Sequence, residues 1–240
     1  MTQTTLPYTF VNSRHLTDTL LADPPGQTFI TGGILCFSVE PKTQNIYVLL
    51  GRETCFEQMD SAQGSWCDFG GKIDASESAI SGAAREFSEE SLCTVKVFFK
   101  QEHTYTHYID TIKQMLQDEN YFLKISIILP QKDGGEHVRV YYLKEIPWQP
   151  DIEEKFSEIR RKLRTVESNG VPCSLRNHPA IKEDNTVNRH FLEKHSIGWW
   201  SIDRLAEVVR NRGKYKHHRF RRSFLPILRL IVHKLQNFYC

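Results

Sequence analysis

The stretch Gly71–Cys93 reads GKIDASESAISGAAREFSEESLC, and it decides the fold and the chemistry together. We expect a helix over 79–91, where neighbours on one face lie three and four residues apart. Glu86, Glu89 and Glu90 then share a face of that helix. Three carboxylates this close repel one another unless a cation lies between them. Hard divalent ions such as Mg²⁺ prefer oxygen ligands of this kind and commonly hold phosphates.

The spacing of these residues resembles the Nudix box, G-x5-E-x7-R-E-U-x-E-E-x-G-U, where U is a bulky apolar residue. Seven positions match in register: Gly71, Glu77, Arg85, Glu86, Phe87, Glu89 and Glu90. Leu92 stands where the family has glycine, and Cys93 is a small substitute for the last apolar residue. Because glycine at a helix exit takes positive φ cheaply, Leu92 predicts a different exit geometry. The alternative to the whole resemblance is a solvated acidic helix face.

The resemblance implies an α/β fold, a Nudix-type α/β/α sandwich with a mixed sheet and additional helices. It also implies attack of water on the pyrophosphate of a nucleoside diphosphate linked to another group, with Mg²⁺ or Mn²⁺ as cofactor. Glu86, Glu89 and Glu90 match the family's metal ligands, and Gly71 matches a carbonyl ligand. Arg85 resembles the arginine that orients the acidic cluster, or is a surface ion-pair partner.

Three more acidic residues have open roles. Glu77 resembles a helper carboxylate near Arg85, or is a solvated acid at the start of the helix. Glu193 lies six residues before Trp199. Relatives use a glutamate from a late loop as a ligand or general base, so Glu193 is a catalytic candidate. Glu136 is its rival, and either one is otherwise an ordinary loop acid.

The substrate is harder to predict from the sequence. Arg52 ends a predicted strand, where relatives place a basic residue near the phosphates, and Lys72 follows the glycine pair. The aromatic residues that could stack on a base or pack in the core are Trp66, Phe69, Trp199 and Trp200. The segment Phe69–Lys72 resembles that of the 8-oxo-dGTPase branch. We therefore expect a nucleotide or dinucleotide substrate, with capped mRNA or a diphosphoinositol polyphosphate as alternatives and a catalytically silent sensor as another.

The hydrophobic pattern predicts further elements. Strands are expected over 29–40, 45–53, 94–100, 120–130, 137–146 and 195–202, and helices over 151–166, 203–209 and 220–235. The first two strands should form a hairpin around the turn PKTQ, and residues 103–118 are either a short helix or an extended excursion. A turn should lead from Trp66 into the acidic helix, with Ser76 or Asp74 as its cap.

Composition is ordinary for a soluble globular protein of 240 residues, with 40% hydrophobic and 25% charged residues. We expect no membrane span, because no run of about 18 apolar residues occurs. The start of the chain lacks a secretory pattern, and six scattered cysteines without C-x-x-C spacing indicate reduced thiols in a cytoplasmic protein. We expect a leader over 1–27, a Nudix domain over 28–210 with a helical insertion near 151–190, and a basic helix over 211–240 packed on the same domain.

Charge is unevenly distributed along the chain. Residues 203–240 hold ten of the 31 Lys and Arg but two of the 29 Asp and Glu, a net charge of +8, whereas the whole chain has +2. This asymmetry predicts an anionic partner for the C-terminal end. The basic stretch 210–222 is a candidate contact for RNA or another polyanion, with a solvated helix face as the alternative. A homodimer is a further expectation from the family.

Overall fold

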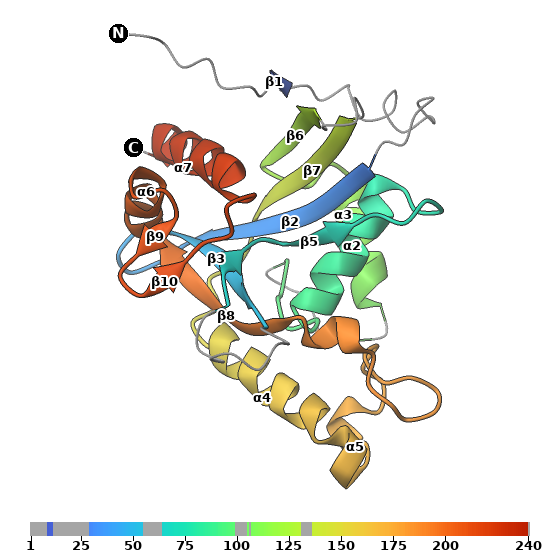
Figure 1. Ribbon diagram of the computed structural model, residues 1–240. Coiled ribbons are helices and arrows are strands. Elements are labelled where there is room, and N and C mark those ends of the chain that lie inside the picture. The colour runs from blue at the N-terminus through green and yellow to red at the C-terminus, as the bar shows by residue number, and fades with distance from the viewer. Residues whose placement is uncertain are drawn as a thin grey trace, which may run out of the picture.

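A mixed β-sheet runs through the molecule, with helices on both of its faces (Figure 1). The structure is a computed structural model that describes residues 9–11, 29–54, 64–98, 105, 107–130 and 136–239. The strands of the sheet are β1 (Thr9–Val11), β2 (Phe29–Val39), β3 (Ile46–Glu53), β4 (Trp66–Cys67), β5 (Phe69–Lys72), β6 (Leu123–Pro130), β7 (Glu136–Glu145) and β8 (Lys194–Ser201). The predicted α/β class with a mixed sheet and additional helices is confirmed.

Strand β2 organises this sheet. It forms the predicted antiparallel hairpin with β3, pairs with β5 in antiparallel register, and pairs with β7 in parallel register. Alternate side chains of β2 point to opposite faces. Ile34 and Cys36 therefore pack in one hydrophobic cluster, and Leu35 and Phe37 pack in the other.

Helices cover each cluster. The helical segments are α2 (Ala79–Glu90), α3 (Tyr108–Gln117), α4 (Ile152–Arg164), α5 (Val166–Asn169), α6 (Ile202–Arg210), α7 (Leu225–Tyr239) and the 3-10 turns η1 (Cys173–Leu175) and η2 (Arg189–Leu192). Helices α2, α3 and α4 contribute to the cluster with Ile34, whereas α6 and α7 contribute to the cluster with Leu35. The sheet thus has a face covered by α2 and a face covered by α7. No helix in the described ranges is long and apolar enough to cross a membrane.

One prediction around the acidic helix is confirmed and another is corrected. Residues 66–72 form the two short strands β4 and β5, which were not expected and which pair with β3 and β2, and a turn at 75–76 then leads into α2 as predicted. Helix α2 is capped by Ser78, whose Oγ accepts a hydrogen bond from the backbone N–H of Ser81 at 3.1 Å, rather than by Ser76 or Asp74. The Ser78 side chain satisfies one of the backbone donors that a helix start leaves unpaired.

The exit of α2 differs from the sequence expectation. Leu92 has φ 53°, in the left-handed region that glycine usually occupies. The N–H of Cys93 donates to the carbonyl oxygen of Ser88 at 3.0 Å, and the Leu92 side chain is fully buried. Leucine therefore adopts the backbone conformation expected of glycine, and the prediction of a different exit geometry is wrong. Burial of the side chain offsets the local strain.

Residues 94–98, expected to begin a strand, are irregular. Val95 and Val97 are buried, as the hydrophobic pattern requires. However, the backbone of Lys96 pairs with the side chain of Gln149: its N–H donates to Oε1 at 2.9 Å, and its carbonyl oxygen accepts from Nε2 at 2.8 Å. A side chain from 53 positions away thus takes the hydrogen bonds that a neighbouring strand would have made.

The C-terminal segment also departs from the pattern. The helix expected over 220–235 begins at Leu225, because Phe220 bridges to Trp66 and the N–H of Arg221 donates to the Trp66 carbonyl oxygen at 3.0 Å. The small hairpin of β9 (Lys214–Tyr215) and β10 (His218–Arg219) precedes this contact. Residues 218–221 of the basic stretch are therefore held against Trp66 of β4. The predicted leader over 1–27 lies outside the described residues apart from β1.

Candidate active site

The carboxylates of α2 lie against the glycine pair of β5. One face of α2 buries Ala83 and Phe87 against the sheet, and the Phe87 ring meets Phe69 of β5 edge to face at 5.6 Å. This packing fixes the helix over the strand. A Cβ added at Gly71 would lie 2.5 Å from Glu86 Oε2, so the absence of a side chain at Gly71 is what admits that carboxylate.

Arg85 is the centre of the cluster. Its Nε and Nη2 donate to the two carboxylate oxygens of Glu77, each at 2.9 Å. Nη1 donates to Glu86 Oε1 at 2.9 Å and to Glu89 Oε2 at 3.1 Å, and Nη2 also donates to the carbonyl oxygen of Lys72 at 3.1 Å. One guanidinium thus ties the start of α2, its last turns and strand β5 together, using its planar fork.

The electrostatics follow from this geometry. The hydrogen bonds from Arg85 lower the pKa of Glu77, and those same bonds are the main reason that the pKa of Arg85 is raised. Burial raises the pKa of Glu86 and of Glu89, and the Arg85 charge opposes both shifts. The carboxylates of α2 are therefore costly to ionise together without a cation.

Glu90 has a different environment. It is buried, and its Oε2 accepts a hydrogen bond from the N–H of Gly70 at 2.6 Å. Its Oε1 lies 2.9 Å from Nζ of Lys194, a buried ammonium that also donates to Cys67 Sγ at 3.0 Å. Burial raises the pKa of Glu90 to about 8, and the charge of Lys194 opposes that shift. Both oxygens of Glu90 are therefore already engaged by the protein.

The residues expected to bind a metal ion do not all have the same surroundings. In the described part of the chain, no three or more His, Cys, Asp or Glu side chains are arranged as a ready metal site. Glu86 and Glu89 each give one oxygen to Arg85, and neither Glu86 Oε2 nor Glu89 Oε1 accepts a hydrogen bond from a described residue. Two hard oxygen donors beside Gly71 fit a divalent cation. Glu90, held by Lys194, does not fit that set as arranged.

The remote carboxylate Glu193 lies close to these donors. It ends η2, which packs against α2, and its negative charge acts on both Glu86 and Glu89. Its Oε1 is 2.9 Å from Nδ1 of His190, and this hydrogen bond raises the pKa of His190. Of the two rivals, the structure brings Glu193 to the cluster, whereas the side chain of Glu136 lies outside what is described.

The four predicted substrate contacts have different positions. Lys72 follows the glycines on β5. Arg52 Nε donates to the Gly64 carbonyl oxygen at 3.2 Å, which anchors it to the loop before β4. Phe69 is fully buried and has no face left for a base, so stacking by Phe69 is corrected to core packing. Trp199 donates from Nε1 to the Gln149 carbonyl oxygen at 2.9 Å and packs on Trp148 at 5.0 Å between ring centroids, which indicates a packing role.

Sequence reasoning missed Lys194 and His190. Lys194 is the first residue of β8, and Gly51 of β3 makes room for its stem, since a Cβ at Gly51 would lie 2.9 Å from Lys194 Cδ. Alternation along β8 could not have found it, because a register shift opposite Arg52 and Glu53 interrupts the alternation between Lys194 and Ser196. His190 carried no signal beyond lying three residues from Glu193.

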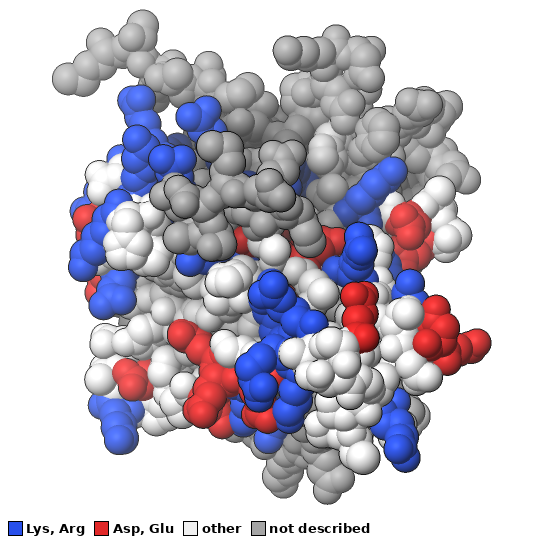
Figure 2. Space-filling view, turned by 60° about the horizontal axis from the view of Figure 1, so that its bottom comes forward, with Lys and Arg blue, Asp and Glu red and all other residues white. Residues whose placement is uncertain are grey.

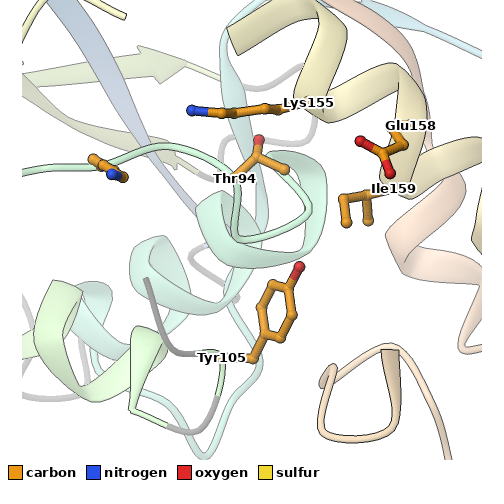
Figure 3. Close-up of a pocket in the computed structure, with 6 residues that line it drawn as sticks. Thr94, Tyr105, Lys155, Glu158 and Ile159 are labelled. Carbon is orange, nitrogen blue, oxygen red and sulfur yellow. The ribbon is translucent and has the colours of Figure 1, made fainter. Parts of the chain in front are cut away.

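Two cavities flank this region. One, of about 270 Å³, lies between α4 and the loop after α2 and is lined by Thr94, Tyr105, Lys155, Glu158 and Ile159, with none of the α2 carboxylates (Figure 3). The other, of about 250 Å³, includes Gly70 and Gly71 in its wall. Acidic and basic side chains are interspersed over the face shown in Figure 2.

No family model and no curated protein matches this chain. Solved structures do match it. The NUDIX domain of Shewanella oneidensis NrtR, complexed with ADP ribose, is 14% identical, with 91% of this chain and 97% of that chain covered and a TM-score of 0.42. The C. elegans Ap4A hydrolase is 12% identical, with 89% of this chain and 99% of that chain covered and a TM-score of 0.41. A NUDIX hydrolase from Alicyclobacillus acidocaldarius is 11% identical, with 88% of this chain and 93% of that chain covered and a TM-score of 0.43. The first and the third are named as Nudix proteins. These likenesses are too weak to carry an argument about function, which therefore depends on the site.

Proposed function

We propose that this chain is a Nudix hydrolase that splits the pyrophosphate of a nucleoside diphosphate linked to another group, as in a nucleotide or dinucleotide. The observation that supports this most directly is the Arg85 cluster. One guanidinium holds Glu77, Glu86 and Glu89 beside a glycine strand, and one oxygen each of Glu86 and Glu89 is left without a hydrogen bond from a described residue. A helix face that was merely solvated would not need this degree of organisation.

Glu86 and Glu89 would hold Mg²⁺ or Mn²⁺, which when bound neutralises pyrophosphate charge and lowers the pKa of a bound water. The chain's own residues supply the rest. Arg85 holds both carboxylates in place through Nη1 and is itself fixed by Glu77. Gly71 keeps the approach to Glu86 open, because any side chain there would meet that carboxylate.

Glu193 is proposed as the general base. Its carboxylate lies close enough to Glu86 and Glu89 to influence them electrostatically, and a base must reach the water that attacks phosphorus. His190 Nδ1, 2.9 Å from Glu193 Oε1, orients the carboxylate and stabilises its charge.

The test is hydrolysis of a panel of substrates by the purified chain with Mg²⁺ and then Mn²⁺, followed by mass spectrometry. The panel contains 8-oxo-dGTP, ordinary dNTPs, ADP-ribose, NADH, Ap4A, diphosphoinositol phosphates and capped RNA. Glu89→Gln should reduce hydrolysis of the preferred substrate about 100-fold or more, because the neutral amide is a poorer ligand for the divalent cation than the carboxylate. Glu207→Gln, on the exposed face of α6, is the matched control and should leave the rate unchanged.

Equal rates for the wild-type protein and Glu89→Gln would refute the proposal. Tight binding of one panel member without its hydrolysis would instead favour a catalytically silent sensor. Preference for capped RNA, lost when the basic residues of 210–222 are neutralised, would establish the decapping alternative.

A further inference from the structure

The cavity beside the glycine pair lies on the opposite side of the sheet from the carboxylates. Thr31 of β2 pairs with Lys72 of β5 on one side and with Arg139 of β7 on the other, so these three residues form one row across three strands. Directly opposite residues share a face, so their side chains all point to the face covered by α7. Gly71 alternates with Lys72 and faces Glu86 on the α2 side.

The cavity has a simple structural origin. The neighbouring row contains Gly70, Gly33 and Tyr141, and its two glycines leave the surface of the sheet bare. The basic segment before α7 closes the space: Arg139 Nη1 donates to the Ser223 carbonyl oxygen at 2.9 Å. The result is the hollow of about 250 Å³ whose wall contains the backbone of the glycine pair.

The charge of the lining favours an anion. Lys72, Arg139 and Arg221 contribute three cationic groups, and the carboxyl group in the lining is Asp68. Asp68 is buried and hydrogen-bonded with Tyr141, and burial raises its pKa. Arg221 also pairs with Glu53 at 3.0 Å, with about half of its side chain exposed, so it lies at the rim. The described lining thus contains more cationic groups than carboxyl groups.

Hydrogen-bonding groups in the lining point to the same ligand. Arg139 Nε, His137 Nε2 and Thr31 Oγ1 are buried and have no hydrogen-bond partner among the described residues. Arginine can only donate, and a hydroxyl or an imidazole can donate as well. Buried donors without acceptors are rare in folded proteins and usually mark a bound water or ion. A group rich in acceptor oxygens would satisfy all three.

We propose that this cavity binds a phosphate group of the substrate, on the far side of the glycine strand from the carboxylates. Its volume is below that of pockets that enclose drug-sized ligands, so it holds a phosphate with a small attached fragment and not a whole nucleotide. Strand β5 pairs with β2, and its other edge pairs with no described strand. Binding of an anion in this cavity does not depend on the proposed hydrolase activity. The assignment of that anion to the substrate does rest on the proposed function.

Binding of inorganic phosphate and of ribose 5-phosphate by isothermal titration calorimetry, in EDTA, tests the site directly. Wild-type protein should bind both compounds, and should not bind ribose. Arg139→Gln and Arg221→Gln should each weaken phosphate binding about tenfold, the usual effect of losing one charged hydrogen bond. Arg222→Gln, the exposed neighbour, should change it less than about twofold. Arg139→Lys, which keeps the charge but loses Nε, should also weaken binding, and a thermal melt confirms that each variant is folded.

The outcomes separate this site from the hydrolase proposal. Unchanged phosphate affinity in Arg139→Gln, or no saturable binding by the wild-type protein, would overturn the site even if the enzyme is active. Glu89→Gln should bind phosphate as the wild-type protein does, since Glu89 lies on the other face. Normal phosphate binding by a chain that hydrolyses nothing would leave the site standing and refute the hydrolase.

Discussion

Replacement of Lys194 by methionine should destabilise the protein by about 3–5 kcal/mol, the usual cost of removing one partner from a buried ion pair. Lys194 Nζ lies 2.9 Å from Glu90 Oε1, and the two side chains are only 2% and 6% exposed. Methionine retains most of the stem that packs over Gly51, so little of the loss comes from packing. The cost arises because Glu90 stays buried and loses its cationic partner, whether it then remains ionised or takes up a proton.

Urea unfolding in EDTA measures this cost, and a thermal melt should show a midpoint lower by about 10 °C for a chain of this length. Lys155→Met is the control, because Lys155 pairs with Asp151 at 2.5 Å with both side chains about half exposed, and its loss should cost less than about 1 kcal/mol. The double variant Lys194→Met/Glu90→Gln should be more stable than the sum of the single losses predicts, by about 1–3 kcal/mol. Equal costs for Lys194→Met and Lys155→Met would refute the argument that Glu90 depends on a buried cation.

Three further substitutions test other parts of the site. Gly71→Ala places a methyl group 2.5 Å from Glu86 Oε2. It should lower the hydrolysis rate about 100-fold and change the midpoint of a thermal melt little. An unchanged rate would show that Glu86 has room to move. Leu92→Gly relieves about 1–2 kcal/mol of left-handed backbone strain but removes a fully buried side chain worth about 2–5 kcal/mol. Urea unfolding should therefore show a lower free energy of unfolding, and a higher value would mean that the strain dominates. Gln149→Leu leaves the backbone of Lys96 without its two partners and should cost about 1–3 kcal/mol by the same measurement, with faster hydrogen exchange at Lys96; normal protection there would contradict this.

Much of the fold was predictable because its signals are local. The hairpin of β2 and β3 follows from two apolar runs around a four-residue turn, and helix α2 follows from residues three and four apart. The same spacing placed Arg85 beside Glu86 and Glu89, since their separation along one helix is fixed. Local periodicity therefore predicted both the acidic cluster and the helix on which it lies.

What the sequence could not show depends on residues far apart in the chain. The parallel pairing of β2 with β7 joins strands about 100 residues apart, and it creates the row that contains Thr31 and Arg139. The hydrogen bonds of Lys96 go to Gln149, which no local pattern announces.

The sequence by itself determined the helix and the arginine that orders the carboxylates, because fixed spacing within one short segment settles their geometry. Tertiary structure alone decided that both oxygens of Glu90 are hydrogen-bonded or ion-paired, whereas Glu86 and Glu89 each keep one oxygen without a described partner. Lys194, more than 100 residues from Glu90, pairs with one oxygen of that carboxylate, and the N–H of Gly70 holds the other. Burial has this effect because an ionised group removed from water must be compensated by whatever cation the fold brings within reach.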